Sequence, residues 1–137
     1  MRALDTNVLV RVLVDDPSER AEVESARALL RAEKSVLVQE VALAELVRVL
    51  RTSYRFARGE IAQALATLIG HQRYVLERPA VAASALTMFS ATNADFADCL
   101  LLAGAAERKC DLVTFDSKLA RLAGALSVVA ALRKENP

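Results

Sequence analysis

The chain has 137 residues, of which 54% are hydrophobic and 26% are charged, and its formal net charge is +1. A chain of this length forms one domain that buries roughly two thirds of its unfolded surface. Aromatic residues make up only 4% and Trp is absent, which argues against binding of single strands by stacking on several rings. The near-neutral charge neither supports nor excludes a nucleic-acid partner, because such binding requires cations gathered on one face.

The two cysteines and the hydropathy pattern indicate a cytoplasmic protein. Cys99 and Cys110 both lie in apolar surroundings, without a CxxC motif or a Cys/His cluster, so we expect two buried, reduced thiols. No apolar run reaches the roughly 20 residues that span a bilayer, and Asp5 lies where the apolar stretch of a signal peptide would begin. We expect a single domain over residues 1–137 that does not enter a membrane.

Short apolar runs alternate along the chain with longer segments of helical periodicity. The short runs predict strands over residues 2–4, 35–38, 74–76, 111–114 and 126–129. The periodic segments predict helices over residues 7–14, 19–33, 41–52, 60–69, 79–90, 96–108 and 116–122. Residues 133–137 are expected to form a frayed tail. This alternation is typical of an α/β fold in which helices cover a parallel sheet.

Four acidic residues interrupt apolar segments, where a charge is costly unless it has a partner. Asp5 directly follows the first predicted strand, and Asp116 follows a later one. Because the carboxyl ends of parallel strands share one edge of a sheet, we expect these two carboxylates on the same edge. Glu45 and Asp98 are each the only charge in an otherwise apolar helical run. All four therefore need a common explanation.

A shared cation would supply that explanation. Four carboxylates brought together repel one another, and some would bind protons unless a cation neutralised them. Oxygen ligands without His or Cys suit Mg²⁺ or Mn²⁺. Such ions activate water and stabilise charge on a phosphoryl oxygen, which is what hydrolysis of a phosphodiester requires. The four acids therefore indicate metal-dependent hydrolysis of nucleic acid.

The acids lie in four short segments that carry a family resemblance: LDTNVL at 4–9, AEL at 44–46, DFADCLL at 95–101 and LVTFD at 112–116. In this order and spacing they resemble the PIN-domain family, in particular its VapC-type toxin ribonucleases, over nearly the whole chain. The resemblance implies a three-layer α/β/α sandwich around a central parallel sheet and metal-dependent RNA endonuclease activity. It also implies a homodimer and a small VapB-like antitoxin that blocks the site.

The resemblance also assigns roles to individual residues. The acids that would ligate Mg²⁺ or Mn²⁺ and carry catalysis are Asp5, Glu45, Asp98 and Asp116. The supporting residues are Thr6, Asn7, Asp95 and Thr114. Thr6 and Asn7 would steer carboxylates or waters, the Thr114 hydroxyl could reach the site, and Asp95 could face the same cleft. Of these, Asp95 is the one least firmly tied to the family pattern.

Each acid also has a purely structural interpretation. Asp5 and Asp116 could cap the helices that follow them, and Asp95 could cap the next helix in the same way. Glu45 could lie on a solvated flank of its helix. Asp98 could simply be a favourable charge near a helix N-terminus. For Asp98, the role of a favourable charge and the role of a ligand are compatible.

Three other features have an open interpretation. The best basic cluster could hold RNA or could be a solvated face; it comprises Arg48, Arg51, Arg55 and Arg58. His71, the only histidine, is expected to cap the end of a helix. Residues 8–14 are more apolar than one helix face requires, which indicates a partner or dimer surface.

Two functions from other classes compete with the nuclease. A small-substrate, metal-dependent phosphatase could use a similar sheet, but a haloacid-dehalogenase-type nucleophile pattern would have a second Asp where Asn7 stands. A non-catalytic PIN-like scaffold could bind protein or RNA without cleaving it. Metal binding and sensitivity to EDTA distinguish these alternatives.

Overall fold

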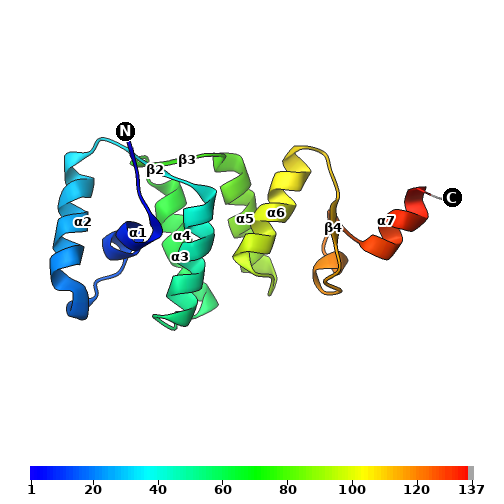
Figure 1. Ribbon diagram of the computed structural model, residues 1–137, viewed down its shortest axis with the longest axis horizontal. Helices are drawn as coiled ribbons and strands as arrows, with labels where there is room; N and C mark the ends of the chain where they lie inside the picture. The colour runs from blue at the N-terminus through cyan, green and yellow to red at the C-terminus, as the bar shows by residue number, and fades with distance from the viewer. Residues whose placement is uncertain (136–137) are drawn as a thin grey trace. The chain divides into compact units, whose positions relative to one another are not determined.

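The computed structural model describes residues 1–135, and Figure 1 shows their helices and strands in chain order. The chain divides into two compact units, the first covering residues 1–82 and the second beginning at Ala83. Parallel strands and helices occur in both units, so the predicted α/β class is confirmed. None of the described helices is long and apolar enough to cross a membrane.

A three-stranded parallel sheet organises the first unit. Its strands are β1 (Arg2–Ala3), β2 (Val36–Val38) and β3 (Tyr74–Leu76), with β2 in the centre. Arg2 pairs with Val36, which in turn pairs with Tyr74. Val36 and Val38 are fully buried, as expected for a parallel strand with neighbours on both sides. Helices make the crossovers that parallel pairing requires.

Two helices follow β1 and two follow β2. They are α1 (Thr6–Leu13), α2 (Arg20–Ala32, after the short 3₁₀ helix Pro17–Glu19), α3 (Glu40–Thr52) and α4 (Arg58–Gly70). Helix α1 lies between α2 and α3 and packs on both (Figure 1). This position explains the apolar excess of residues 8–14, since Leu9 and Val10 are buried and the other apolar side chains there are half-buried within one chain.

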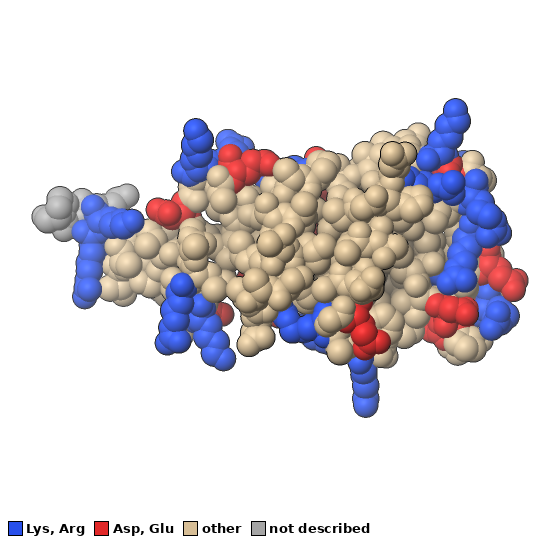
Figure 2. Space-filling view, turned by 180° about the vertical axis from the view of Figure 1, so that it is seen from behind, with Lys and Arg blue, Asp and Glu red and all other residues tan. Residues whose placement is uncertain are grey.

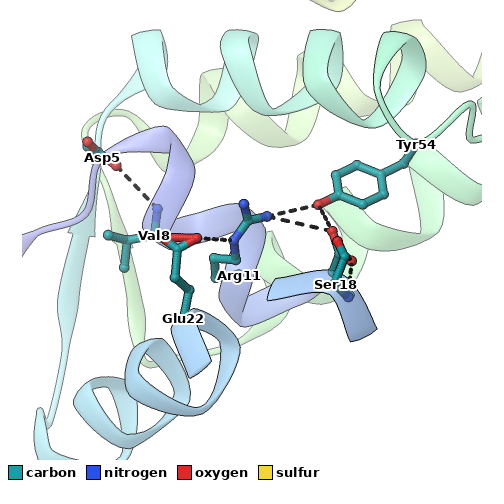
Figure 3. A network of polar contacts seen from close by, with 7 residues as sticks. Asp5, Val8, Arg11, Ser18, Glu22 and Tyr54 are labelled. Atoms are coloured by element: carbon teal, nitrogen blue, oxygen red, sulfur yellow. Dashed lines mark hydrogen bonds and ion pairs between the residues drawn. The ribbon is translucent and has the colours of Figure 1, made fainter. Parts of the chain in front are cut away.

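A polar network links the helices of the first unit (Figure 3). The hydroxyl of Tyr54 donates to Asp16 at 2.8 Å and accepts from Nη1 of Arg11 at 2.9 Å. Nε of Arg11 donates to Glu22 on α2, and this bond raises the pKa of Arg11. Burial raises the pKa of the Tyr54 hydroxyl. The network ties α1, the α1–α2 loop and the segment after α3 together.

A second polar cluster fixes the start of α3 against the end of β3. Arg78 donates from Nε and Nη2 to the two carboxylate oxygens of Glu40, at 2.8 and 2.6 Å. Glu77 accepts the backbone N–H of Glu40 at 2.6 Å, which satisfies a free donor at the helix N-terminus. Bidentate pairs of this kind are among the stronger charge-assisted contacts. They position α3 at the carboxyl ends of β2 and β3.

The second unit is built around a parallel pair of strands, β4 (Leu112–Thr114) and β5 (Ala125–Ser127). Its remaining elements are α6 (Phe96–Glu107), the 3₁₀ helix Leu119–Arg121 and α7 (Val128–Glu135), while α5 (Pro79–Ala91) begins in the first unit and ends in the second. Leu102, Leu119 and Ala125 form a small core. Gly124 turns the chain into β5 with φ at +88°, a conformation that suits glycine.

Most predicted elements are present within two residues of their expected ends, but the C-terminal third differs. The predicted helix 116–122 contains only the 3₁₀ helix Leu119–Arg121. The predicted strand 126–129 ends at Ser127, because the Ser127 hydroxyl accepts the N–H of Ala130 and starts α7 there. Helix α7 runs to Glu135, so the predicted tail is wrong for 133–135, and residues 136–137 lie outside the described part.

The single histidine lies where it was predicted, whereas one of the two cysteines does not. His71 is the C-cap residue of α4, as predicted, and its Nδ1 accepts the N–H of Arg73. Cys99 is buried as expected, but Cys110 is exposed, which corrects the prediction of two buried thiols. Cys110 follows Lys109, whose φ of +57° turns the chain away from the end of α6.

The Glu40–Arg78 pair predicts a pH-dependent contribution to stability. The hydrogen bond from Arg78 lowers the pKa of Glu40 below its ordinary value of 4.5. A lowered pKa means that the stabilisation is complete above the unfolded-state pKa and is lost as pH falls through the folded-state value. Urea unfolding should therefore show Glu40→Gln less stable than wild type at pH 7, with the difference shrinking below about pH 4.5.

Glu24→Gln is the matched control, because Glu24 is an exposed acid on α2 with no ion pair among residues 1–135. It should change the free energy of unfolding little at any pH. Equal changes in the free energy of unfolding for Glu40→Gln and Glu24→Gln would contradict a stabilising role for the Glu40–Arg78 pair.

Candidate functional site

Polar side chains of the first unit gather where its three parallel strands end. Asp5 follows β1, Gln39 follows β2 and Glu77 follows β3. All three line one cavity of about 400 Å³, together with Leu4, Thr6, Val41 and Ala42. The carboxyl edge of a parallel sheet is where ligands bind in open α/β folds. This cavity is the first candidate region.

Asp5 acts as a helix cap in the structure. It is the N-cap residue of α1, and its Oδ1 accepts the N–H of Val8 at 3.2 Å (Figure 3). The carboxylate is exposed, so the expectation that it is a buried charge is wrong. The reason is that β1 ends at Ala3 and Leu4 alone fills the buried position before the helix. A cap uses one carboxylate oxygen and leaves the other for a ligand.

The other predicted residues of the first unit are distributed differently. Thr6 lines the same cavity as Asp5. Asn7 instead lines a groove of about 280 Å³ with Arg11, Glu22 and other residues of α1 and α2. Glu45 is exposed on α3 and does not line the Asp5 cavity, in agreement with its alternative interpretation as a solvated flank. The structure thus brings Thr6 to Asp5 but not Asn7 or Glu45.

Three acids of the second unit line one cavity, which we call the acidic cleft. Asp95 precedes α6, Asp98 lies in its first turn and Asp116 follows β4. These three carboxylates line one cavity of about 280 Å³; its other lining residues are Thr92, Asn93, Ala94, Lys118, Leu119 and Leu122. Two of the four predicted ligands, Asp98 and Asp116, and the predicted supporting residue Asp95 therefore meet here.

The acids of the cleft interact electrostatically. Burial raises the pKa of the Asp98 carboxyl, and the neighbouring carboxylates of Asp95 and Asp116 raise it further. The position of Asp98 near the N-terminus of α6 favours its ionised form, whereas burial and the neighbouring carboxylates favour its protonated form. The cleft therefore carries negative charge that its own residues do not compensate at Asp98.

A short hydrogen-bonded turn holds Asp116 at the cleft. The hydroxyl of Thr114 accepts the N–H of Asp116 at 2.9 Å. Oδ1 of Asp116 in turn accepts the N–H groups of Lys118 and Leu119, at 2.9 and 3.1 Å. Thr114 is thus a positioning residue for Asp116, and Asp116 caps the following turn as its structural alternative predicted. The second oxygen of its carboxylate remains available to a ligand.

The basic cluster follows α3 into the next helix. Arg48 and Arg51 lie on the C-terminal half of α3, Arg55 is in the loop with φ at +55°, and Arg58 starts α4. Arg48, Arg51 and Arg55 are exposed. On the face drawn in Figure 2, Lys and Arg side chains lie beside Asp and Glu side chains and do not form one continuous basic field. The RNA-binding role of the cluster stays a prediction.

Sequence reasoning missed two charged residues that line the candidate cavities, Glu77 and Lys118. Glu77 follows β3 directly, and Asp5 comes two residues after the end of β1. A charged residue just after a predicted strand was therefore the sequence signal that could have identified Glu77. Lys118 stands two residues after Asp116 in a turn that the sequence pattern suggested was helical. Its place beside the acids depends on that turn.

The donor set of the acidic cleft suits a hard cation. Carboxylate oxygens without His or Cys are the ligands that Mg²⁺ and Mn²⁺ prefer, and a cation would relieve the repulsion that raises the pKa of Asp98. Within residues 1–135, however, no three His, Cys, Asp or Glu side chains are already arranged as a ligand group. The chemistry of the residues fits a divalent ion.

Of two comparisons with known proteins, one identifies the family of the chain. A search of curated proteins finds no match. A family model described as PIN domain matches residues 2–125, which span both compact units and every predicted acid of the site. The match covers most of the 137 residues. The chain therefore belongs to the PIN-domain family.

Proposed function

We propose that this protein is a Mg²⁺- or Mn²⁺-dependent endoribonuclease that hydrolyses a phosphodiester bond with water. The observation that carries the proposal is the acidic cleft, where Asp95, Asp98 and Asp116 line one cavity and the pKa of Asp98 is raised. PIN domains are typically metal-dependent nucleases that act on nucleic acid. The cleft supplies the oxygen ligands that such chemistry needs.

In this proposal the acids that would ligate the ion are Asp5, Glu45, Asp98 and Asp116. When bound, a divalent ion lowers the pKa of a water molecule and stabilises negative charge on a phosphoryl oxygen. Thr114 supports this arrangement by fixing the turn at Asp116. Thr6 and Asn7 would orient carboxylates or waters, and Asp95 adds negative charge beside Asp98.

We also propose that the protein is the toxin of a VapBC-type pair. The motifs that support this are the four acidic segments in their order and spacing, within a chain of 137 residues. A VapB-like antitoxin would then block the site, and the toxin would act on RNA as a cytoplasmic homodimer. In this role the arginines of α3 and its following loop would contact RNA phosphates.

Removing the metal should abolish cleavage. Purified protein free of any partner should cut single-stranded RNA with Mg²⁺ or Mn²⁺ and should stop in EDTA, with activity returning when excess Mn²⁺ is added. The measurement is gel electrophoresis of labelled RNA. Cleavage that continues unchanged in EDTA would overturn the metal-dependent mechanism, whereas metal binding without cleavage of any RNA would favour the non-catalytic scaffold.

Substitution of ligands in both units tests whether they serve one metal site. Asp5→Asn and Asp98→Asn should each lower the rate of cleavage at least roughly a hundredfold and weaken Mn²⁺ binding, measured by calorimetry. Residues that act as a unit are strongly non-additive, so the double variant should be no slower than the worse single variant. If the loss of rate in the double variant equals the product of the two single losses, the two acids act independently.

The raised pKa of Asp98 predicts a gain in stability when its charge is removed. An acid whose pKa is higher in the folded state destabilises that state once pH exceeds the folded value. In EDTA at pH 7, Asp98→Asn should therefore have a higher Tm than wild type, and the gap should narrow as the pH falls and Asp98 takes up its proton. Asp111→Asn, at an exposed acid of the same unit, serves as the control. A lower Tm for Asp98→Asn at pH 7 would contradict the prediction.

A further inference from the structure

One basic residue lines the acidic cleft. Lys118 lies in the turn after β4, on the same cavity as Asp95, Asp98 and Asp116, and none of the other lining residues is basic. Its backbone N–H donates to Oδ1 of Asp116 at 2.9 Å, so the turn holds the residue two positions from a candidate ligand. The side chain itself is exposed.

The ammonium group of Lys118 is not used to neutralise the acids. Within residues 1–135 it forms no ion pair. Its charge is therefore available to an anion that enters the cleft.

Charge balance indicates which anion would use it. The three carboxylates carry about three negative charges when ionised, and each RNA phosphate brings one more. A divalent ion leaves the cleft with a net negative charge, which still repels a phosphate. The single positive charge of Lys118, which lines the cleft, offsets this remaining negative charge. Lysine suits the task because its ammonium is a compact charge on a flexible stem.

We propose that Lys118 binds a phosphate of the RNA substrate as the strand enters the acidic cleft. The inference rests on the proposed function for the class of substrate, but it concerns binding, not the chemical step. It makes Lys118 a substrate-binding residue that acts next to the acids without ligating metal. Metal affinity should therefore not depend on its charge.

Lys109 offers a matched control, because it lies at the opposite end of α6 from the acidic cleft. Lys109 follows the C-terminus of α6, whereas the cleft lies at its N-terminus. The 12 residues of α6 separate the two ends by about 18 Å at 1.5 Å per residue. Lys109→Gln makes the same change of charge as Lys118→Gln in the same unit, but away from the cleft.

The test measures binding of a short, fluorescein-labelled single-stranded RNA of mixed sequence by fluorescence anisotropy. It is run over a range of KCl concentrations, once in EDTA and once with Ca²⁺. Lys118→Gln should weaken binding roughly two- to fivefold, the range of an exposed charge pair. It should also reduce the slope of log K against log salt by about 0.7, the value for one phosphate contact on a single strand.

The other variants should leave the binding curves near wild type. Lys109→Gln should change neither affinity nor slope, and Lys118→Arg should restore both, because it keeps the charge. Mn²⁺ affinity measured by calorimetry should be the same in wild type and Lys118→Gln. Equal RNA binding by Lys118→Gln and Lys109→Gln would overturn the inference, and so would wild-type protein that binds no RNA in either medium.

These outcomes are separate from those that test the nuclease. If wild type binds RNA through Lys118 but cuts no RNA with Mn²⁺, the proposed activity fails and the binding role stands. If wild type cuts RNA and Lys118→Gln binds and cuts equally well, the binding role fails and the nuclease stands.

Discussion

Parallel pairing on the central strand β2 is the constraint on which the first unit depends. Because β1 and β3 both pair with it in the same direction, the residues that follow all three strands emerge at one edge. That is why Asp5, Gln39 and Glu77 share a cavity although they are far apart in the sequence. The hydrogen bond from Glu40 to Glu77 then sets the start of α3 at the same edge. Behind this polar edge the central strand β2 is apolar, and the valines at both of its ends are shielded from solvent.

In the second unit, other structural features position the acids of the cleft. Its two strands are short, and the position of Asp116 depends on a side-chain turn with Thr114 and not on the sheet edge alone. Asp98 is brought opposite by the first turn of α6, where Phe96 and Cys99 anchor the helix in the interior. The result is a group of like charges that weakens the folded state as long as nothing positive occupies the cleft. Such electrostatic strain is expected where a protein keeps charges for binding instead of stability.

The sequence allowed the fold class and most helices and strands to be predicted because they follow apolar periodicity, and β3 was predicted with its observed ends at Tyr74 and Leu76. The sequence pattern could not show where a local hydrogen bond, and not apolar periodicity, decides the secondary structure. Val128 and Val129 favour a strand by their side chains, yet one hydroxyl at Ser127 starts a helix there. Pattern alone also could not distinguish an acid that caps a helix from one that binds a ligand, and Asp5 and Asp116 do the first in this structure. The proximity of Lys118 to the acids depends on the geometry of a turn, which no spacing rule encodes.

The exposure of Cys110 has a practical consequence. The chain has two cysteines, and the other, Cys99, is buried in α6, so Cys110 is the one thiol that a maleimide dye can reach in the folded protein. It stands past the C-terminal end of the helix whose first turn carries Asp98, and the first unit contains no cysteine at all. A fluorophore can thus be attached to the second unit alone, without altering any acid of the cleft. The wild-type sequence already carries a single-site label for following how that unit responds to ions, RNA or a protein partner.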